Sequence, residues 1–290
     1  MSASSAPPVA TQHAEGRLDG AEGKQIYWQS WQPEGEAKAA VVIAHGVSEH
    51  GGRYRYVVER LVPDGFAVYA IDHRGHGRSD GSGAQIDRMA HVVSDLDQLV
   101  DLARAEHPGA KLFLLGHSMG GCIAITYAIV HQPKLDGLAL SAPLAALDAA
   151  PLPLRVIAKG LSVLAPGAGV FQVDSSAVSR DPAEVKAYVE EDPLVHTGKL
   201  PARTVQELSD TVGRFEADVP KLTLPLVVMV GTEDALVPPS AGKMVHDRAG
   251  STDKTFHSYD GYYHEIFNEP AGERERPLND LAEWLSAHTT

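Results

Sequence analysis

The stretch that decides the fold of this 290-residue chain is KLFLLGHSMG, residues 111–120. Its first five residues form a short apolar run that predicts a buried strand, and the apolar run GCIAITYAIV at 121–130 predicts a helix. Gly116 and Gly120 stand two places before and after Ser118, where residues without a Cβ let a strand and a helix approach closely. We therefore expect Ser118 at a strand-to-helix corner, held in a strained backbone conformation as a nucleophile.

Strand-like and helix-like patterns alternate along most of the chain. This alternation predicts an α/β fold with a mostly parallel sheet and helices on both faces, and it places catalytic groups at the carboxyl ends of the strands. The expected strands are Gln25–Trp31, Ala39–Ala44, Ala67–Ile71, Lys111–Leu115, Gly137–Ser141, Leu226–Val230 and Lys254–Tyr259. The expected helices are Tyr54–Leu61, Met89–Glu106, Gly121–His131 and an amphipathic helix near Leu278–Ala287.

The alternation stops at residues 143–220, which are rich in Ala, Leu and Pro over their first part and show no clear strand. We expect this segment to be a helical cap or lid inserted into a core that comprises residues 17–142 and 221–290. Residues 1–16 are expected to form a disordered polar tail, because they lack both the basic start and the apolar run of a signal peptide.

Composition excludes several classes of protein. The formal net charge of −13 argues against a nucleic-acid partner and against electrostatic attraction to anionic lipids. Cys122 is the single cysteine, so intrachain disulfides and structural zinc sites with several thiolates are excluded. We find no apolar stretch long enough to span a bilayer, and we expect a soluble protein that is cytoplasmic by default.

A serine nucleophile needs a histidine base and a carboxylate that orients it, and in this fold the acid precedes the histidine in the chain. Asp234 follows the apolar strand LVVMV in a Gly-x-x-Asp turn and is the favoured acid, with Glu233 as its rival. His264 lies in the loop after the last expected strand and fits the base. His257, the competing histidine, lies inside that strand.

An oxyanion hole needs two backbone N–H groups that point at the developing negative charge. The residue after the nucleophile, Met119, is expected to provide the first N–H group. The second is expected from Val47, because the pair His45-Gly46 turns the chain directly after an early strand.

These residues lie in strings that resemble the monoglyceride lipases (monoacylglycerol lipases) of the α/β-hydrolase superfamily, of the serine aminopeptidase S33 or hydrolase-4 type. The resemblance extends from about Gly23 to the C-terminal helix. It implies the α/β-hydrolase fold with an inserted helical cap. The strings are HGVSEHGGRY from His45, DHRGHGRSDG from Asp72, GHSMGG from Gly116, DSSAVSRDP from Asp174, AYVEEDPLVH from Ala187 and GYYHE from Gly261.

The resemblance also implies a role for each residue of a site. By it, the catalytic residues are Ser118, Asp234 and His264, the oxyanion-hole residues are Val47 and Met119, and the residues near the glycerol end are Glu49, Arg53 and Tyr188. Taken without the resemblance, the favoured interpretation of Glu49 and Arg53 is an i, i+4 ion pair on the surface. Ser48 departs from the family string, which has glycine there, and would be strained if this position requires a positive φ.

The function that the resemblance implies is hydrolysis of the ester bond of monoacylglycerols to fatty acid and glycerol through an acyl-enzyme, with no metal and no organic cofactor. A broader carboxylesterase or a lysophospholipase with the same triad is the alternative. Ser118 argues against a haloalkane dehalogenase or an epoxide hydrolase, which use aspartate at this position. A complete triad argues against a noncatalytic lipid-binding member, and the sequence leaves the oligomeric state open.

The apolar stretch Leu152–Val170 of the expected cap is denser in Leu, Val and Ala than a small solvated subdomain needs. We expect it to line an acyl tunnel and to dock shallowly on a membrane or micelle through exposed apolar side chains. The alternative is that these residues form the buried core of the cap.

Overall fold

The computed structural model describes residues 12–146 and 159–289, and its centre is an eight-stranded sheet. Strands β3 to β10 of this sheet run parallel, whereas β2 is antiparallel to both of its neighbours, β1 and β4. In spatial order the strands are β1 (Gln12–Asp19), β2 (Gln25–Gln32), β4 (Phe66–Ile71), β3 (Ala39–Ala44), β5 (Lys111–His117), β6 (Gly137–Ser141), β9 (Leu226–Gly231) and β10 (Lys254–Tyr259).

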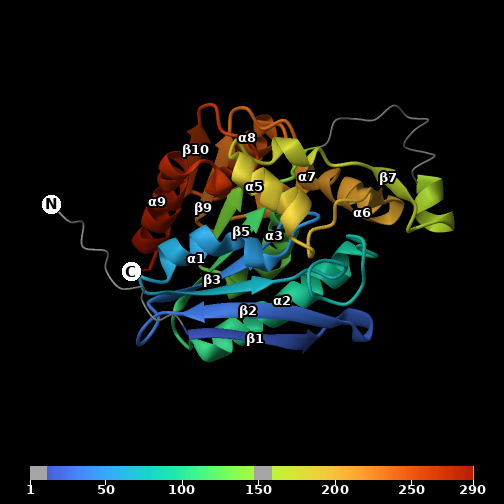
Figure 1. Ribbon diagram of the computed structural model, residues 1–290. Coiled ribbons are helices and arrows are strands. Elements are labelled where there is room, and N and C mark those ends of the chain that lie inside the picture. Colours follow the sequence, from blue (N-terminus) through green and yellow to red (C-terminus); the bar gives the residue numbers. More distant parts are fainter. Residues whose placement is uncertain (1–11, 147–158, 290) are drawn as a thin grey trace.

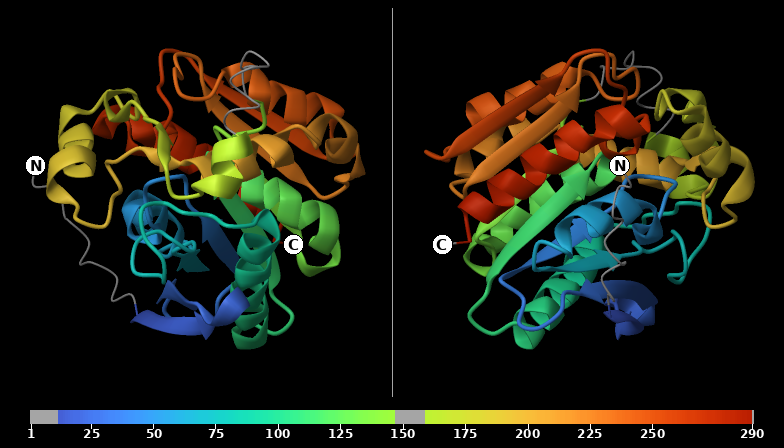
Figure 2. Two further views of the ribbon diagram at one scale, coloured as in Figure 1. Left: turned by 90° about the vertical axis from the view of Figure 1, so that its right-hand side faces the viewer. Right: turned by 60° about the vertical axis from the view of Figure 1, so that its left-hand side comes forward.

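Helices cover both faces of the sheet (Figure 1), and Figure 2 shows the two layers from other directions. Side chains alternate between the faces along each buried strand: Ala40 and Val42 pack on one side, Val41 and Ile43 on the other. The first side is covered by α2 (Met89–Glu106), α3 (Met119–His131) and α8 (Pro239–Arg248), and the second by α1 (Arg55–Leu61) and α9 (Ala271–Ala287). The predicted α/β sheet with helices on both faces is confirmed.

Short 3₁₀ turns connect several of these elements. They are η1 (Ala21–Gly23), η2 (Gly51–Tyr54), η3 (Gln132–Lys134) and η7 (Ile266–Asn268).

The chain between β6 and β9 forms short helices and one small strand pair at one edge of the sheet (Figure 1). Residues 159–164 are helical, and the pairing of β7 with β8 corrects the expectation that this segment holds no strand. The other elements are β7 (Gly169–Phe171), η4 (Ser175–Ala177), α5 (Pro182–Lys186), the π turn η5 (Ala187–Glu191), β8 (Leu200–Pro201), α6 (Ala202–Val212), α7 (Phe215–Asp218) and η6 (Val219–Lys221). That residues 143–220 act as a cap stays a prediction.

One prediction about the N-terminal region is wrong for residues 12–16. These residues belong to β1, which pairs along its whole length with β2, whereas residues 1–11 lie outside the described part of the chain. The sequence QHAEGRLD has no apolar alternation because most of its side chains are exposed at the edge of the sheet. Its backbone hydrogen bonds to β2 hold it, and hydropathy patterning does not report these.

Among the helices of the described residues, none combines the length and apolarity needed to cross a bilayer.

The corner between β5 and α3 is where the sheet and its helical layer come closest. Ser118 adopts φ 52° and ψ −118°, a conformation that residues with side chains rarely take. A Cβ on Gly120 would overlap the carbonyl group of Ala44 in the neighbouring strand. Glycine is therefore required at this position.

We expect Gly120→Ala to destabilise the protein by about 3 kcal/mol or more, because backbone atoms that the new methyl group meets cannot move aside. Gly272→Ala is the matched control, since a Cβ there meets no atom within 4 Å and Gly272 lies inside α9. That change should stabilise by roughly 0.5–1 kcal/mol. Urea unfolding of both variants measures the difference, and equal stabilities would refute the packing argument.

Candidate active site

Ser118 lies at the carboxyl end of β5, where its backbone is held on both sides. Its N–H donates to the carbonyl of Ser141 at 3.1 Å, and its carbonyl accepts N–H groups of Cys122 at 3.1 Å and Leu144 at 2.9 Å. The side chain lines an open pocket with a cavity volume of about 170 Å³. The strained corner therefore presents the hydroxyl to a pocket that is open to a ligand.

Asp234 and His264 are hydrogen bonded to each other at the same edge of the sheet. Nδ1 of His264 lies 2.7 Å from Oδ2 of Asp234. The other carboxylate oxygen accepts the N–H groups of Leu236 at 2.8 Å and Val237 at 2.9 Å. Because Asp234 accepts these bonds and is buried, it stays in place and orients the imidazole so that Nε2 is left free.

The loops that carry these two residues cross closely. A Cβ on Gly231 would overlap the carbonyl oxygens of Tyr262 and Tyr263, and the N–H of Glu233 donates to the carbonyl of Tyr262 at 3.0 Å. This approach requires glycine at the end of β9 and brings the Asp234 turn against the His264 loop.

The structure places the two rival residues away from the pocket. Glu233 is exposed, whereas the neighbouring Asp234 is buried against His264. His257 lies on β10 with Nδ1 3.7 Å from the carboxylate of Asp280, and it is not among the residues that line the pocket.

The environment of His264 favours its protonated form. Burial acts to lower the pKa of His264, but the charge and hydrogen bond of Asp234 outweigh it and raise this pKa above the usual value. His264 and Ser118 line the same pocket, although the hydrogen bonds among the described residues do not include one between them. Such bonds are often long before substrate binds and tighten in the complex.

The loop after β3 lies against Ser118, since a Cβ on Gly46 would lie 3.3 Å from Cβ of Ser118. Val47 lines the pocket beside Gly46, and neither its N–H nor that of Met119 donates a hydrogen bond within the described residues. Ser48 has φ 70°, so this position does require the left-handed backbone region in which serine is strained. The loop nevertheless forms, and Glu49 holds it by accepting the N–H of Gly46 at 2.5 Å.

Glu49 and Arg53 form a buried ion pair, and the interpretation as a surface pair is therefore wrong. Nε of Arg53 lies 3.2 Å from Oε2 of Glu49, and its Nη2 lies 2.7 Å from Oε2 of Glu265. The hydroxyl of Tyr54 donates to Glu49 at 2.8 Å, and Arg53 stacks on the ring of Tyr188 at 4.5 Å. Glu49 and Tyr188 line the main pocket, whereas Arg53 lines a small adjoining cavity that shares Glu49 with it.

Glu265 is a site residue that sequence reasoning missed. It lines the main pocket, next in the chain to His264, and it is buried. The only signal in the sequence was its place in the string GYYHE. From the sequence alone, a charged residue beside a loop histidine is expected to be exposed to solvent. Only the structure shows that Arg53 pairs with it.

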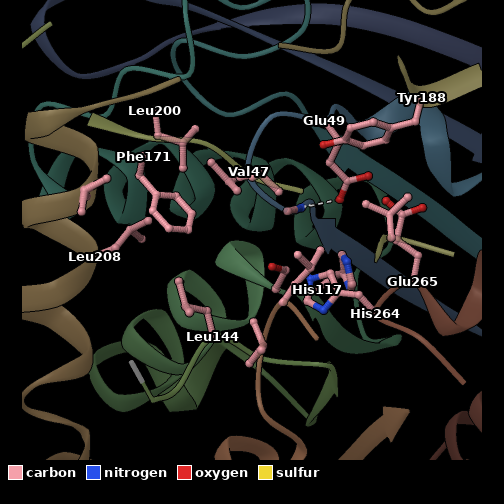
Figure 3. A pocket seen from close by; sticks show the side chains of 17 residues that line it. Val47, Glu49, His117, Leu144, Phe171, Tyr188, Leu200, Leu208, His264 and Glu265 are labelled. Carbon is pink, nitrogen blue, oxygen red and sulfur yellow. Dashed lines mark hydrogen bonds between the residues drawn. The ribbon is translucent and has the colours of Figure 1, made fainter. Parts of the chain in front are cut away.

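The pocket has a polar end and an apolar end, and Figure 3 shows the two groups on either side of the reactive residues. Glu49, Tyr188 and Glu265 stand at the polar end near His264. The apolar end is lined by Leu144, Phe171, Leu200 and Leu208. The pocket therefore suits a ligand with a hydrophobic chain on one side of the reacting bond and hydroxyl groups on the other.

One group of side chains has the spacing of a metal site within the described residues. Ligand atoms of Glu22, Asp87 and His91 lie within 4.8 Å of one another, near the start of α2. Arg74 already pairs with Asp87 at 3.1 Å, and none of the three residues lines the pocket. This group is independent of the chemistry at Ser118.

Comparison with known proteins places these features in a family. Residues 35–271 match the family model described as serine aminopeptidase, S33. The chain is 39% identical over 281 residues to a monoacylglycerol lipase of Mycolicibacterium smegmatis, covering 97% of this chain and 99% of the relative. It is 34% identical to the human monoglyceride lipase, covering 94% and 90% of the two chains.

A solved structure of a monoacylglycerol lipase has the same fold as this chain. The crystal structure of the Paleococcus ferrophilus monoacylglycerol lipase matches with a TM-score of 0.80 at 32% identity, covering 91% of this chain and 99% of that one.

The geometry of the Asp234–His264 pair generates a prediction about pH. His264 must be neutral to accept a proton, so kcat/KM for ester hydrolysis should fall as pH drops through a pKa above about 6.5.

Asp234→Asn should lower kcat by roughly 10⁴. Glu233→Gln is the control because Glu233 is exposed, and it should leave the pH profile of p-nitrophenyl ester hydrolysis unchanged. If Glu233→Gln lowers kcat more than Asp234→Asn does, the assignment of Asp234 as the acid is wrong.

Proposed function

The chain belongs to the serine aminopeptidase S33 family of hydrolases, and we propose that it is a serine hydrolase that cleaves monoacylglycerols into fatty acid and glycerol. The observation that carries the proposal is the division of the pocket, with apolar side chains on one side of Ser118 and His264 and buried carboxylates on the other. The relatives at 39% and 34% identity, which are a monoacylglycerol lipase and a monoglyceride lipase, support the same substrate.

In the proposed mechanism Oγ of Ser118 attacks the ester carbonyl and its proton passes to Nε2 of His264. Asp234 stabilises the resulting imidazolium through the bond at Nδ1. The N–H groups of Val47 and Met119 stabilise the oxyanion, in accord with their lack of other acceptors within the described residues.

Collapse of the tetrahedral intermediate breaks the bond to the glycerol oxygen, which leaves with the proton from His264. The fatty acyl group stays on Ser118 as an ester. A water molecule then gives its proton to His264 and attacks this acyl-enzyme, releasing the fatty acid and restoring the Ser118 hydroxyl.

We assign the fatty acyl chain to the apolar end and glycerol to the polar end. Glu49 and Tyr188 line that end, and Arg53 supports it through its bond to Glu49 and its contact with the ring of Tyr188. Glu49 also accepts a hydrogen bond from the N–H of Gly46, which links the glycerol end to the loop that carries Val47.

We propose further that the segment between β6 and β9 acts as a cap that meets a membrane or micelle surface. Val163 is 69%, Leu164 86% and Phe171 55% exposed, and Phe171 also lines the apolar end of the pocket. Such side chains on the same segment as the pocket wall suit contact with a lipid surface. Residues 152–158 of the apolar stretch Leu152–Val170 lie outside the described residues, and a cytoplasmic location stays a prediction.

Ser118→Ala tests the proposed function directly. The variant should hydrolyse monoacylglycerol at no more than the residual 10³- to 10⁴-fold enhancement over water that binding and the oxyanion hole provide, because no acyl-enzyme forms. Its circular dichroism and urea midpoint should match those of the native protein. Native protein that turns over lysophosphatidylcholine faster than monoacylglycerol would favour the lysophospholipase alternative, and activity that persists in Ser118→Ala would refute the nucleophile.

Replacing Leu164 and Phe171 by serine tests the contact with lipid. The native protein should float with neutral vesicles, and raising the salt concentration should not weaken the binding, because hydrophobic contact is not screened. The double variant should lose flotation and hydrolyse long-chain substrate in vesicles more slowly. Val130→Ser is the matched control, since Val130 is 66% exposed on α3. If the native protein, the double variant and Val130→Ser float equally, Leu164 and Phe171 do not form a lipid-binding surface.

A further inference from the structure

The polar end of the pocket carries more negative than positive charge. Glu49 and Glu265 both line it and are buried, and the single guanidinium of Arg53 pairs with both. The titratable residues that line the pocket are Glu49, His117, Tyr188, His264 and Glu265. No lysine or arginine is among the described lining residues, and the nearby His264 is paired with Asp234, so one carboxylate charge at this end has no cation of its own to balance it.

The carboxyl group of Glu265 is held in its charged form. Burial acts to raise the pKa of Glu265, but the charge of Arg53 outweighs it and the pKa lies below the usual value. Nδ2 of Asn268 donates to the same carboxylate at 2.7 Å. Burial and the nearby carboxylates raise the pKa of Tyr188, so this phenol stays neutral.

The two carboxylates differ in what they offer a ligand. Both oxygens of Glu49 are occupied, Oε1 by the N–H of Gly46 and the hydroxyl of Tyr54, and Oε2 by Arg53. In Glu265, Arg53 and Asn268 both bind Oε2. Its Oε1 makes no hydrogen bond with the described residues. Glu265 therefore provides a charged acceptor oxygen at the pocket wall that the protein itself does not use.

We infer that Glu265 determines which leaving alcohol the site accepts: its Oε1 accepts a hydrogen bond from a free hydroxyl of the substrate, and its charge excludes alcohols that carry a carboxylate or phosphate. The inference rests on the proposed function and adds the class of head group. An ionised carboxylate only accepts hydrogen bonds, so hydroxyl groups match it and anionic oxygens do not. Like charges about 6 Å apart at an effective dielectric of about 20 disfavour binding by roughly 100-fold.

Two esters of similar size test whether the charge of the leaving alcohol, rather than its shape, determines kcat/KM. The first is 1-octanoylglycerol, and the second is the matched octanoyl ester of glyceric acid, in which one terminal CH₂OH is replaced by a carboxylate. We expect the native protein to prefer the glycerol ester in kcat/KM by roughly 100-fold. Because the charges are buried, this preference should change little between low and high salt.

Glu265→Gln keeps the shape of the side chain and removes its charge. The variant should reduce the preference for the glycerol ester at least about tenfold, chiefly by accepting the glycerate ester better. Glu269→Gln is the matched control, because Glu269 is a buried carboxylate of the same loop that pairs with Arg180 at 2.9 Å and does not line the pocket. It should leave the ratio of the two esters as in the native protein, even if both rates fall.

The outcomes distinguish this inference from the proposed function. A native protein that does not hydrolyse 1-octanoylglycerol refutes the proposed function. Hydrolysis of both esters with equal kcat/KM, or a folded Glu265→Gln variant with an unchanged preference, overturns the role of Glu265. If Glu265→Gln does not fold, the native protein provides the test. A preference for the glycerol ester that does not change with salt supports the role of Glu265, and the absence of a preference overturns it.

Discussion

The close approach of α3 to the central sheet is the constraint on which the rest of the structure depends. Gly120 lies so near the carbonyl of Ala44 that no side chain fits, and this contact holds the start of α3 against the carboxyl end of β3. Ser118 must then turn the chain within one residue, at φ 52°. The loop after β3 lies against the same corner, since a Cβ on Gly46 would lie 3.3 Å from Cβ of Ser118. The position of Ser118, the proposed nucleophile, therefore follows from backbone packing at one corner.

Charge is arranged around this corner in two separate groups. Asp234 is tied to His264 and to its own loop, so its charge acts on the imidazole. Glu49, Arg53 and Glu265 form the second group, at the end of the pocket that we assign to the leaving alcohol. Burial strengthens both groups because little water screens them. The apolar end has no such charges among its described lining residues, and this asymmetry favours one orientation of the ester that we propose as substrate.

Much of the fold could be predicted from the sequence, because buried parallel strands are continuous apolar runs and glycine marks the close approaches. The strands Ala39–Ala44 and Gly137–Ser141 have the bounds that the sequence predicted. Strand β1 could not be predicted, since its exposed polar residues are held by backbone hydrogen bonds to β2.

In the site, loop residues that follow a strand could be placed, as the Asp234–His264 contact illustrates. The position of Glu265 could not, because its burial depends on Arg53, 212 residues earlier in the chain. Long-range pairing of charges leaves no local pattern in a sequence.

The central claim is that Ser118 carries the acyl group during turnover. The most direct measurement is a rapid acid quench of the protein during the first turnovers of an activated octanoyl ester, followed by peptide mass spectrometry. We predict an octanoyl ester on the peptide that contains Ser118, formed in a burst with release of the alcohol. An octanoyl group on a different side chain, or turnover with no burst and no acylated Ser118, would contradict it.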